Sequence, residues 1–375
     1  MEQRKHKIAI ITCTRAEYGY LKRVMQLVEN DADMELQLVV GGAHLRQEQG
    51  YTLRMIEEDG FRIDAKLDYL QFDNTEKGIV ESMALCQKQC AEVFAQLMPD
   101  AIVVLGDRYE LLPICSAALI MRIPIVHISG GDVTEGAIDN EIRNAITMMA
   151  DMHFPGTEDS AANIRRMRNT MKHIYTVGEP SIENLAKEQL LTKQELSEKF
   201  GWDAAKLWIV VTLHPETKLT LQENIAMART MMQVLAEQQD AQVIVTLANT
   251  DCGGVEMNAV YKEYAERYNH IYVYPSLGQK NFNSAMAQAY CVAGNSSSGI
   301  VEAPFLAVPV ISIGLRQKGR HRCANIIDVP NCTEASLKAA LAQIPTLHPQ
   351  SDTYWGDGET SQKIVDQIKD YLANR

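Results

Sequence analysis

The chain has 375 residues, of which 22% are charged and 46% are hydrophobic, and its formal net charge is −12. This length exceeds the roughly 250–300 residues at which a single core stops growing, so we expect two domains. The composition is that of an ordinary globular protein, and the negative charge disfavours a nucleic-acid or anionic-membrane partner. The charge does not exclude an anionic ligand, because backbone amides can hold phosphate locally.

Targeting signals and metal-binding patterns are not evident in the sequence. The first apolar run, Ile8–Ile11, is far too short for a membrane span or a signal-peptide core. The eight cysteines are scattered, and several lie inside apolar runs, which predicts reduced and mostly structural thiols. Cys86 and Cys90 are one helical turn apart, but no Cys/His partner set follows them, so we predict no metal. These features predict a cytoplasmic protein.

Short β-rich runs alternate with longer amphipathic segments, which is typical of a parallel sheet with crossover helices. In the first half, strands are predicted at Lys7–Thr12, Leu36–Val40, Ala101–Leu105, Pro124–Ile128 and Ile174–Val177. Helices are predicted at Tyr20–Glu29, Gly78–Leu97, Leu111–Met121 and Glu158–Met167. We predict the domain hinge near Gly178-Glu179-Pro180, because the residue before a proline is held out of the helical region.

The second half restarts the same alternation. Strands are predicted at Leu207–Leu213, Gln242–Leu247, Ile271–Tyr274, Tyr290–Ala293 and Val308–Ile313. Helices are predicted at Leu221–Glu237, Val255–Glu266, Glu302–Phe305 with its flanks, and Ser361–Asn374. We therefore predict an α/β fold of two Rossmann-like domains facing a cleft, with ligands at the carboxyl ends of the strands. The expected domains are residues 1–178 and 179–358, with a C-terminal helix in 359–375 that packs back toward the first domain.

The loop after the first strand, Thr12–Gly19, contains no G-x-G-x-x-G, which disfavours a nicotinamide site. The chain also has no G-x-x-x-x-G-K-[ST], so the usual nucleoside-triphosphatase interpretation is excluded. Arg15 in this loop can clamp a phosphate with two hydrogen bonds. Taken alone, it is equally consistent with an ordinary surface arginine.

A serine-rich loop, Gly294–Gly299, lies between an apolar strand and a predicted helix. Its backbone N–H groups and the hydroxyls of Ser296, Ser297 and Ser298 suit a diphosphate at a helix N-terminus. A helix cap is the alternative, but three serines between Gly294 and Gly299 exceed what a cap needs. Glu302, one turn along the same predicted helix, is well placed for ribose hydroxyls, although alone it is an ordinary solvated glutamate.

Acidic residues follow two buried strands. Asp107 comes directly after Ala101–Leu105, where it either points into the cleft or caps the next helix. Asp132 follows the next strand, and the loop continues to Asp139 and Arg143. Acids gathered after neighbouring strand ends are what proton transfer at a sugar carbon requires.

Two histidines and a basic loop complete the candidate residues. His214 precedes a proline at a strand end, so it is directed into a loop, and His44 follows the second strand in the same way. The basic loop Arg316–Arg320 follows another strand and suits a diphosphate, although a solvated charge run is the default interpretation.

Together these residues resemble one family, the hydrolysing UDP-N-acetylglucosamine 2-epimerases of bacterial sialic-acid synthesis. The matching stretches occur in the family's order and span nearly the whole chain: Thr14–Gly19, Gly106–Glu110, Gly130–Asp132, Asp139–Thr147, His214–Thr217, Gly294–Gly299 and Arg316–Arg320. The resemblance implies a glycosyltransferase-B-like pair of Rossmann-type domains and no cofactor. It further implies a UDP-sugar as the partner, UDP and free N-acetylmannosamine as products, and a homo-oligomer, either a dimer or a tetramer.

The resemblance also implies roles for individual residues. Ser296, Ser297 and Arg316 are expected to hold the diphosphate together with Ser298 and Gly299, and Glu302 the ribose. The sugar and its leaving group are expected to contact Arg15, His44, Asp107, Asp132, Asp139, Arg143 and His214. The family's route is elimination of UDP to a glycal, followed by addition of water. We expect Asp107 and Asp139 to share the proton transfers, with His214 near the leaving group and Asp132 completing the catalytic set.

The chain departs from the family pattern in its acidic loop. Many relatives carry glutamate at Ser129 and at Asp132, an aspartate pair at Ile138-Asp139, and histidine at Asn144. These departures point to a sugar modified at C4 or C6, as in legionaminic-type pathways. A non-hydrolysing epimerase and a glycosyltransferase remain alternatives. A non-catalytic sugar-nucleotide-binding regulator is a further one, and it would not need the acids.

Overall fold

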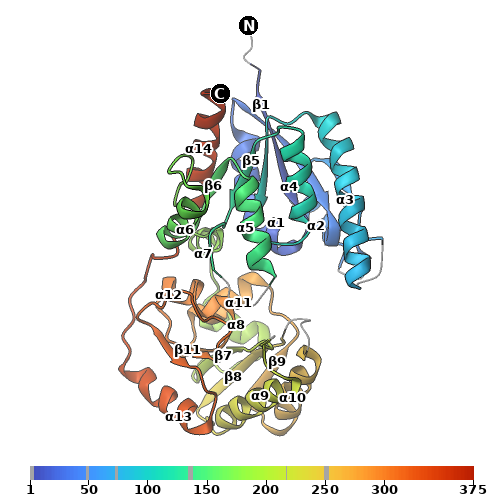
Figure 1. The fold of residues 1–375 in the computed structure, drawn as a ribbon. Coiled ribbons are helices and arrows are strands. Elements are labelled where there is room, and N and C mark those ends of the chain that lie inside the picture. Colours follow the sequence, from blue (N-terminus) through green and yellow to red (C-terminus); the bar gives the residue numbers. More distant parts are fainter. Residues whose placement is uncertain (1–3, 48–49, 72–74, 134–137, 217, 249–252) are drawn as a thin grey trace. The chain divides into compact units, whose positions relative to one another are not determined.

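The computed structural model describes residues 4–47, 50–71, 75–133, 138–216, 218–248 and 253–375; Thr217 and Cys252 lie outside them. The described residues divide into two compact units, each built on its own parallel sheet (Figure 1). The first unit comprises the chain up to Val133, then Ile138–Asn184 and Gly356–Arg375, and the second comprises Leu185–Trp355. This confirms the prediction of two Rossmann-like α/β domains.

The first sheet has six parallel strands in the order β3-β2-β1-β4-β5-β6. Its strands β1, β4 and β5 are buried along most of their length, as the continuous apolar runs of the sequence predict. The strand bounds are β1 His6–Thr12, β2 Met34–Gly41, β3 Ile63–Leu67, β4 Ala101–Leu105, β5 Ile125–Ile128 and β6 Met152–Phe154.

The helices of this unit include the last helix of the chain, shown by the red ribbon in Figure 1. That helix, α14, packs against α1, and Leu21, Met25, Ile364 and Ile368 lie in one buried cluster with the sheet. The helix bounds are α1 Arg15–Asn30, α2 Leu53–Glu58, α3 Glu76–Leu97, α4 Leu111–Ile120, α5 Asp139–Met149, α6 Glu158–Arg168, α7 Pro180–Lys187 and α14 Thr360–Ala373. The division between the units falls within α7.

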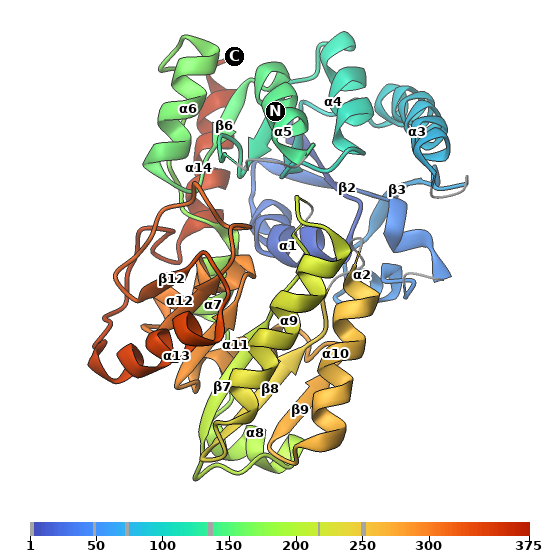
Figure 2. The same ribbon diagram turned by 60° about the horizontal axis from the view of Figure 1, so that its bottom comes forward.

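The second sheet is also parallel, in the order β12-β11-β10-β7-β8-β9. Side chains of α9, α10 and α13 pack on one face, and those of α8, α11 and α12 on the other; Figure 2 shows α9 and α10 along the strands. The strands are β7 Leu207–Thr212, β8 Ala241–Thr246, β9 Ile271–Tyr274, β10 Cys291–Gly294, β11 Val310–Ile313 and β12 Ile326–Val329. The helices are α8 Lys193–Phe200, α9 Leu221–Ala236, α10 Gly254–Arg267, α11 Gln279–Ala287, α12 Glu302–Phe305 and α13 Glu334–Gln343.

Two predictions about local structure in the first unit were wrong. The segment Ile174–Val177 is not a strand: it makes a single bridge, from Ile174 to His153, and the strand at this position is β6. A strand of three residues carries too little alternation to be predicted. Asp139 and Arg143 do not lie in a loop, because α5 begins at Asp139. In the part of the chain described, no helix combines the length and the apolar character needed to span a membrane.

Candidate functional site

Both sheets have the same strand order relative to the chain, and each has one switch point, where connections leave in opposite directions. These points lie between β1 and β4 and between β7 and β10. Ligands of such folds bind in the crevice at the carboxyl ends of the strands there. Arg15 and Asp107 follow β1 and β4, while His214 and the serine loop follow β7 and β10. The predicted residues therefore fall at both switch points.

In the first unit, Asp107 pairs with Arg143. The guanidinium of Arg143, on α5, donates to the Asp107 carboxylate and, at 2.8 Å, to the main-chain carbonyl of Asp132. Only 4% of Arg143 is exposed, so its charge requires a compensating anion, and Asp107 supplies it. The Asp107 side chain itself is 30% exposed. One buried cation thus holds the loops after β4 and β5 together.

Asp139 joins this group as the first residue of α5. Burial, followed by the negative charge of Asp107, raises the pKa of the Asp139 carboxyl above its ordinary value. Asp139 therefore keeps its proton to higher pH than a free aspartate, while Asp107 faces a permanent cation. Two neighbouring carboxyl groups in different environments are suited to opposite proton-transfer roles.

The other predicted residues of this unit have different surroundings. The Asp132 carboxylate accepts a hydrogen bond from Ser160, on the first turn of α6, at 2.5 Å. Arg15 is exposed at the start of α1. His44 is fully buried, and its ring nitrogens contact the hydroxyls of Thr12 at 3.0 Å and Thr52 at 2.7 Å.

A cluster of two buried glutamates and a partly exposed arginine beside Asp107 was missed by the sequence analysis. Glu17 accepts N–H hydrogen bonds from Cys13 at 2.6 Å and Thr14 at 3.1 Å, and burial raises the pKa of its carboxyl to about 7. Arg108 donates to Glu110 at 2.7 Å and lies 3.8 Å from Glu17. The spacing of Thr14 and Glu17 is that of a capping box, which was the available signal.

His127 is a second missed residue. It is fully buried, and burial lowers the pKa of its imidazole to about 4, so the ring is neutral near pH 7. Its Nε2 donates to the carbonyl of Gly106 at 2.8 Å, because a carbonyl can only accept. This hydrogen bond fixes the main chain directly before Asp107.

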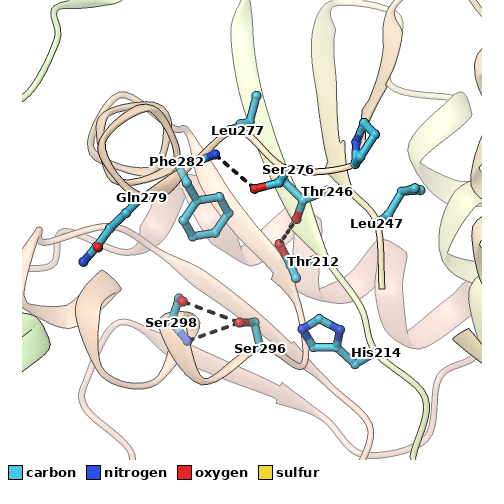
Figure 3. A pocket seen from close by; sticks show the side chains of 12 residues that line it. Thr212, His214, Thr246, Leu247, Ser276, Leu277, Gln279, Phe282, Ser296 and Ser298 are labelled. Carbon is cyan, nitrogen blue, oxygen red and sulfur yellow. Dashed lines mark hydrogen bonds between the residues drawn. The ribbon is translucent and has the colours of Figure 1, made fainter. Parts of the chain in front are cut away.

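In the second unit, a cavity of about 290 Å³ lies at the carboxyl ends of β7, β8, β9 and β10 (Figure 3). The Thr212 and Thr246 hydroxyls meet at 2.6 Å on its floor, and the Phe282 ring borders it. Its lining residues are Thr212, His214, Thr246, Leu247, Pro275, Ser276, Leu277, Gly278, Gln279, Phe282, Ser296 and Ser298.

The serine loop forms a tight turn at one side of this cavity. Ser297–Gly299 is a single 3₁₀ turn, and the Ser296 hydroxyl accepts the N–H of Ser298 at 3.4 Å. Ser297 is exposed. Glu302 does not share this turn: it begins the separate helix α12 and is 8% exposed. The helix cap that was the alternative interpretation is therefore present at Ser296, and an exposed serine, Ser297, remains beside it.

Buried groups not identified from the sequence bring His214, the serine turn and Arg316 together. The Asn295 side chain accepts the N–H of His214 at 2.7 Å and donates to the His214 carbonyl at 2.9 Å. The Glu216 carboxylate accepts the N–H groups of Leu315 at 2.7 Å and Arg316 at 3.1 Å. Arg316 in turn donates to the Asn295 carbonyl at 3.3 Å.

Two Rossmann-like units, with a cavity at the switch point of the second and an acidic group at the switch point of the first, define a glycosyltransferase-B-like fold with candidate ligand sites in both units. The family profile "UDP-N-acetylglucosamine 2-epimerase" matches residues 26–369. The chain belongs to this family of UDP-sugar 2-epimerases, as the sequence resemblance predicted.

Individual relatives agree with this assignment. The chain is 35% identical, over 86% of its own length and 84% of the relative's, to a GDP/UDP-N,N'-diacetylbacillosamine 2-epimerase (hydrolyzing) of Campylobacter jejuni. It is 32% identical to a polysialic acid biosynthesis protein of Escherichia coli, covering 98% and 95% of the two chains. Among solved structures, an S. aureus MnaA–UDP co-structure matches with a TM-score of 0.79 and 17% identity, over 98% and 97% of the two chains, which shows the shared fold.

Proposed function

We propose that this protein is a hydrolysing 2-epimerase that converts a UDP-2-acetamido sugar and water to UDP and the free 2-epimer of the sugar. With UDP-N-acetylglucosamine the products are UDP and N-acetylmannosamine. The observation that carries the proposal is the pairing of Asp107 with Arg143 beside Asp139. A change of configuration at C2 requires that carbon to lose and regain a proton, and two carboxyl groups in different environments suit these two transfers.

The proposal assigns UDP to the second domain, residues 179–358. The exposed Ser297 and the guanidinium of Arg316, each fixed at its main chain, are suited to the diphosphate. The Phe282 ring offers an apolar surface to the uracil base, and Glu302 is assigned to the ribose hydroxyls. The S. aureus protein of the same fold was solved as a complex with UDP, which supports a UDP-sugar ligand.

The sugar chemistry belongs to the first domain, residues 1–178. In the elimination, Asp107 takes the C2 proton, the C–H electrons form the C1=C2 bond, and the C1–O bond breaks toward UDP. In the hydration, Asp139 returns a proton to C2 from the other face, and water oxygen bonds to C1. His214 is assigned to the leaving diphosphate, since its main chain is tied to the serine turn through Asn295.

Two sugars are candidates. UDP-N-acetylglucosamine is the simplest substrate of the family. A UDP-sugar modified at C4 or C6 is the other candidate, and it is favoured by the hydrolysing Campylobacter relative, a GDP/UDP-N,N'-diacetylbacillosamine 2-epimerase. Ser129 favours the same candidate, because many relatives carry glutamate at this position and a departure here is expected to follow a difference in the sugar.

A panel of UDP-sugars with products identified by NMR tests the proposal. UDP and a free manno-configured sugar are expected from one or both candidates. UDP-N-acetylmannosamine as product would make the protein a non-hydrolysing epimerase, and a sugar released in the gluco configuration would make it a simple hydrolase. Binding of UDP-sugars without turnover would indicate a regulator.

A further inference from the structure

Glu179 contacts Ser129, although fifty positions separate them in the chain. The Ser129 hydroxyl donates to Oε2 of Glu179 at 3.0 Å. Ser129 directly follows β5, and its backbone is left-handed with φ 57°, a conformation that non-glycine residues adopt rarely. The hydroxyl is thus held in a strained position where it meets this carboxylate.

The loop after β6 leaves room for the same carboxylate. A Cβ added to Gly156 would overlap Oε1 of Glu179, so the carboxylate lies against the bare main chain of that loop. The Glu179 main chain is fixed as well, since its carbonyl accepts from the Thr360 hydroxyl at 3.4 Å. Ser129 and Gly156 follow neighbouring strands, and the Ser129 N–H donates to the carbonyl of Phe154 at 2.9 Å. Glu179 therefore lies at the same sheet edge as Asp107 and Asp132.

The chemistry of the proposed reaction leaves one proton transfer without an assigned group. In the proposed function Asp107 and Asp139 are assigned to the two faces of C2, and neither is assigned to the water; the Asp132 carboxylate faces Ser160 on α6. The water that adds to C1 must also lose a proton, and a positioned carboxylate is a suitable acceptor. A neutral hydroxyl donor, such as Ser129, orients that carboxylate without cancelling its charge.

We propose that Glu179 is a further catalytic carboxylate of this site, and that Ser129 positions it for the hydration step. This inference rests on the proposed function. Glu179 takes one proton from water as the water oxygen bonds to C1 of the glycal. The C1=C2 electron pair forms the new C2–H bond with the proton from Asp139. Elimination of UDP does not need Glu179.

The test compares Glu179→Gln with wild type on the UDP-sugar that wild type hydrolyses. We expect formation of the manno sugar to fall about 10²–10⁴-fold, while UDP is still released and the glycal accumulates, detected by NMR. Glu158→Gln is the matched control: Glu158 also accepts from a hydroxyl, that of Thr176, but its side chain is 66% exposed and pairs with Arg165. It should behave as wild type.

Gly156→Ala is a second variant that displaces the carboxylate without removing it, and it should accumulate the glycal too. A manno-sugar rate for Glu179→Gln within about threefold of wild type would overturn the inference. Equal losses of UDP release and sugar formation would also overturn it, because a merely structural role slows both steps together. If wild type releases UDP from no UDP-sugar of the panel, the proposed function itself fails, which is a separate result.

Discussion

The buried guanidinium of Arg143 donates to the carboxylate of Asp107. Arg143 stands on the first turns of α5 and Asp107 follows β4, so the pair fixes the acidic group at the switch point of the first sheet. Because Asp139 begins the same helix, any change in this pairing also changes the surroundings of the second carboxyl group.

Neutral variants of these acids should separate binding from chemistry. Asp107→Asn and Asp139→Asn are expected to lose about 10²–10⁴-fold in turnover, because a placed group contributes that much to proton transfer. Their UDP affinity, measured by calorimetry, should stay near that of wild type, since UDP is assigned to the second domain. Glu141→Gln, an exposed acid on the first turn of α5, controls for the loss of charge there. Wild-type turnover in both aspartate variants would remove them from the mechanism.

Isotope labels should trace the elimination route. In deuterium oxide, the released sugar is expected to carry deuterium at C2, because elimination removes the original hydrogen and solvent refills the position. In labelled water, the oxygen label should enter the sugar at C1 and not UDP. NMR and mass spectrometry of the products read both labels. Retention of the substrate's C2 hydrogen would rule out this scheme.

The serine turn and the basic loop should control UDP affinity. Ser297→Ala and Arg316→Ala each remove a proposed donor to the diphosphate, and hydrogen bonds to charged groups are worth about 1.5–3 kcal/mol. We expect UDP binding to weaken about ten- to a hundredfold in each variant by calorimetry. Lys262→Ala, an exposed cation on α10 outside the cavity lining, should leave the affinity unchanged. Unchanged affinity in both site variants would exclude this loop from the UDP site.

The close approach of Gly294, at the end of β10, to the end of the neighbouring strand β7 should be sensitive to a single methyl group. Gly294 has φ 138°, and an added Cβ would overlap the main-chain carbonyl of Thr212. Gly201 also has a positive φ, 74°, but a Cβ added there would meet open space. Gly201→Ala therefore measures the cost of backbone strain alone. Gly201→Ala is expected to cost about 1 kcal/mol and Gly294→Ala about 2–4 kcal/mol, since overpacking adds to strain. Thermal unfolding measures both, and equal midpoints would contradict this account.

Glu17 should make stability depend on pH. Burial raises the pKa of its carboxyl from 4.5 to about 7, so between these values the folded protein binds more protons than the unfolded chain. Its contribution to stability is therefore lost as the pH rises through about 7, by about 3 kcal/mol in total. Glu17→Gln can still accept the N–H groups of Cys13 and Thr14 but cannot titrate.

Urea denaturation at several pH values measures this effect. Relative to wild type, Glu17→Gln should gain stability as the pH rises from about 4 to about 8. Parallel pH dependences of the two proteins would show that Glu17 does not titrate in this range. The opposite result, in which wild type gains stability relative to Glu17→Gln as the pH rises, would mean that Arg108 keeps the Glu17 carboxylate charged.

The sequence alone determined the fold class and most of the strands. Continuous apolar runs such as Ala101–Leu105 are required by a parallel sheet that is buried on both faces, so composition and periodicity suffice to predict them. The places of Asp107, His214 and the serine loop after strands were also predictable, because parallel strands direct their carboxyl ends to one edge of a sheet. The strand β6 was not predictable, because three residues are too few to show an alternation of apolar and polar side chains.

Only the tertiary structure decided which of these residues meet. The pairing of Arg143 with Asp107, the two hydrogen bonds between Asn295 and His214, and the contact of Glu179 with Ser129 each join residues dozens of positions apart. His44 has the same sequence signal as His214 but is buried between two threonine hydroxyls. Local patterns fix where a side chain leaves the backbone, whereas burial and hydrogen-bond partners depend on which elements the chain brings alongside it.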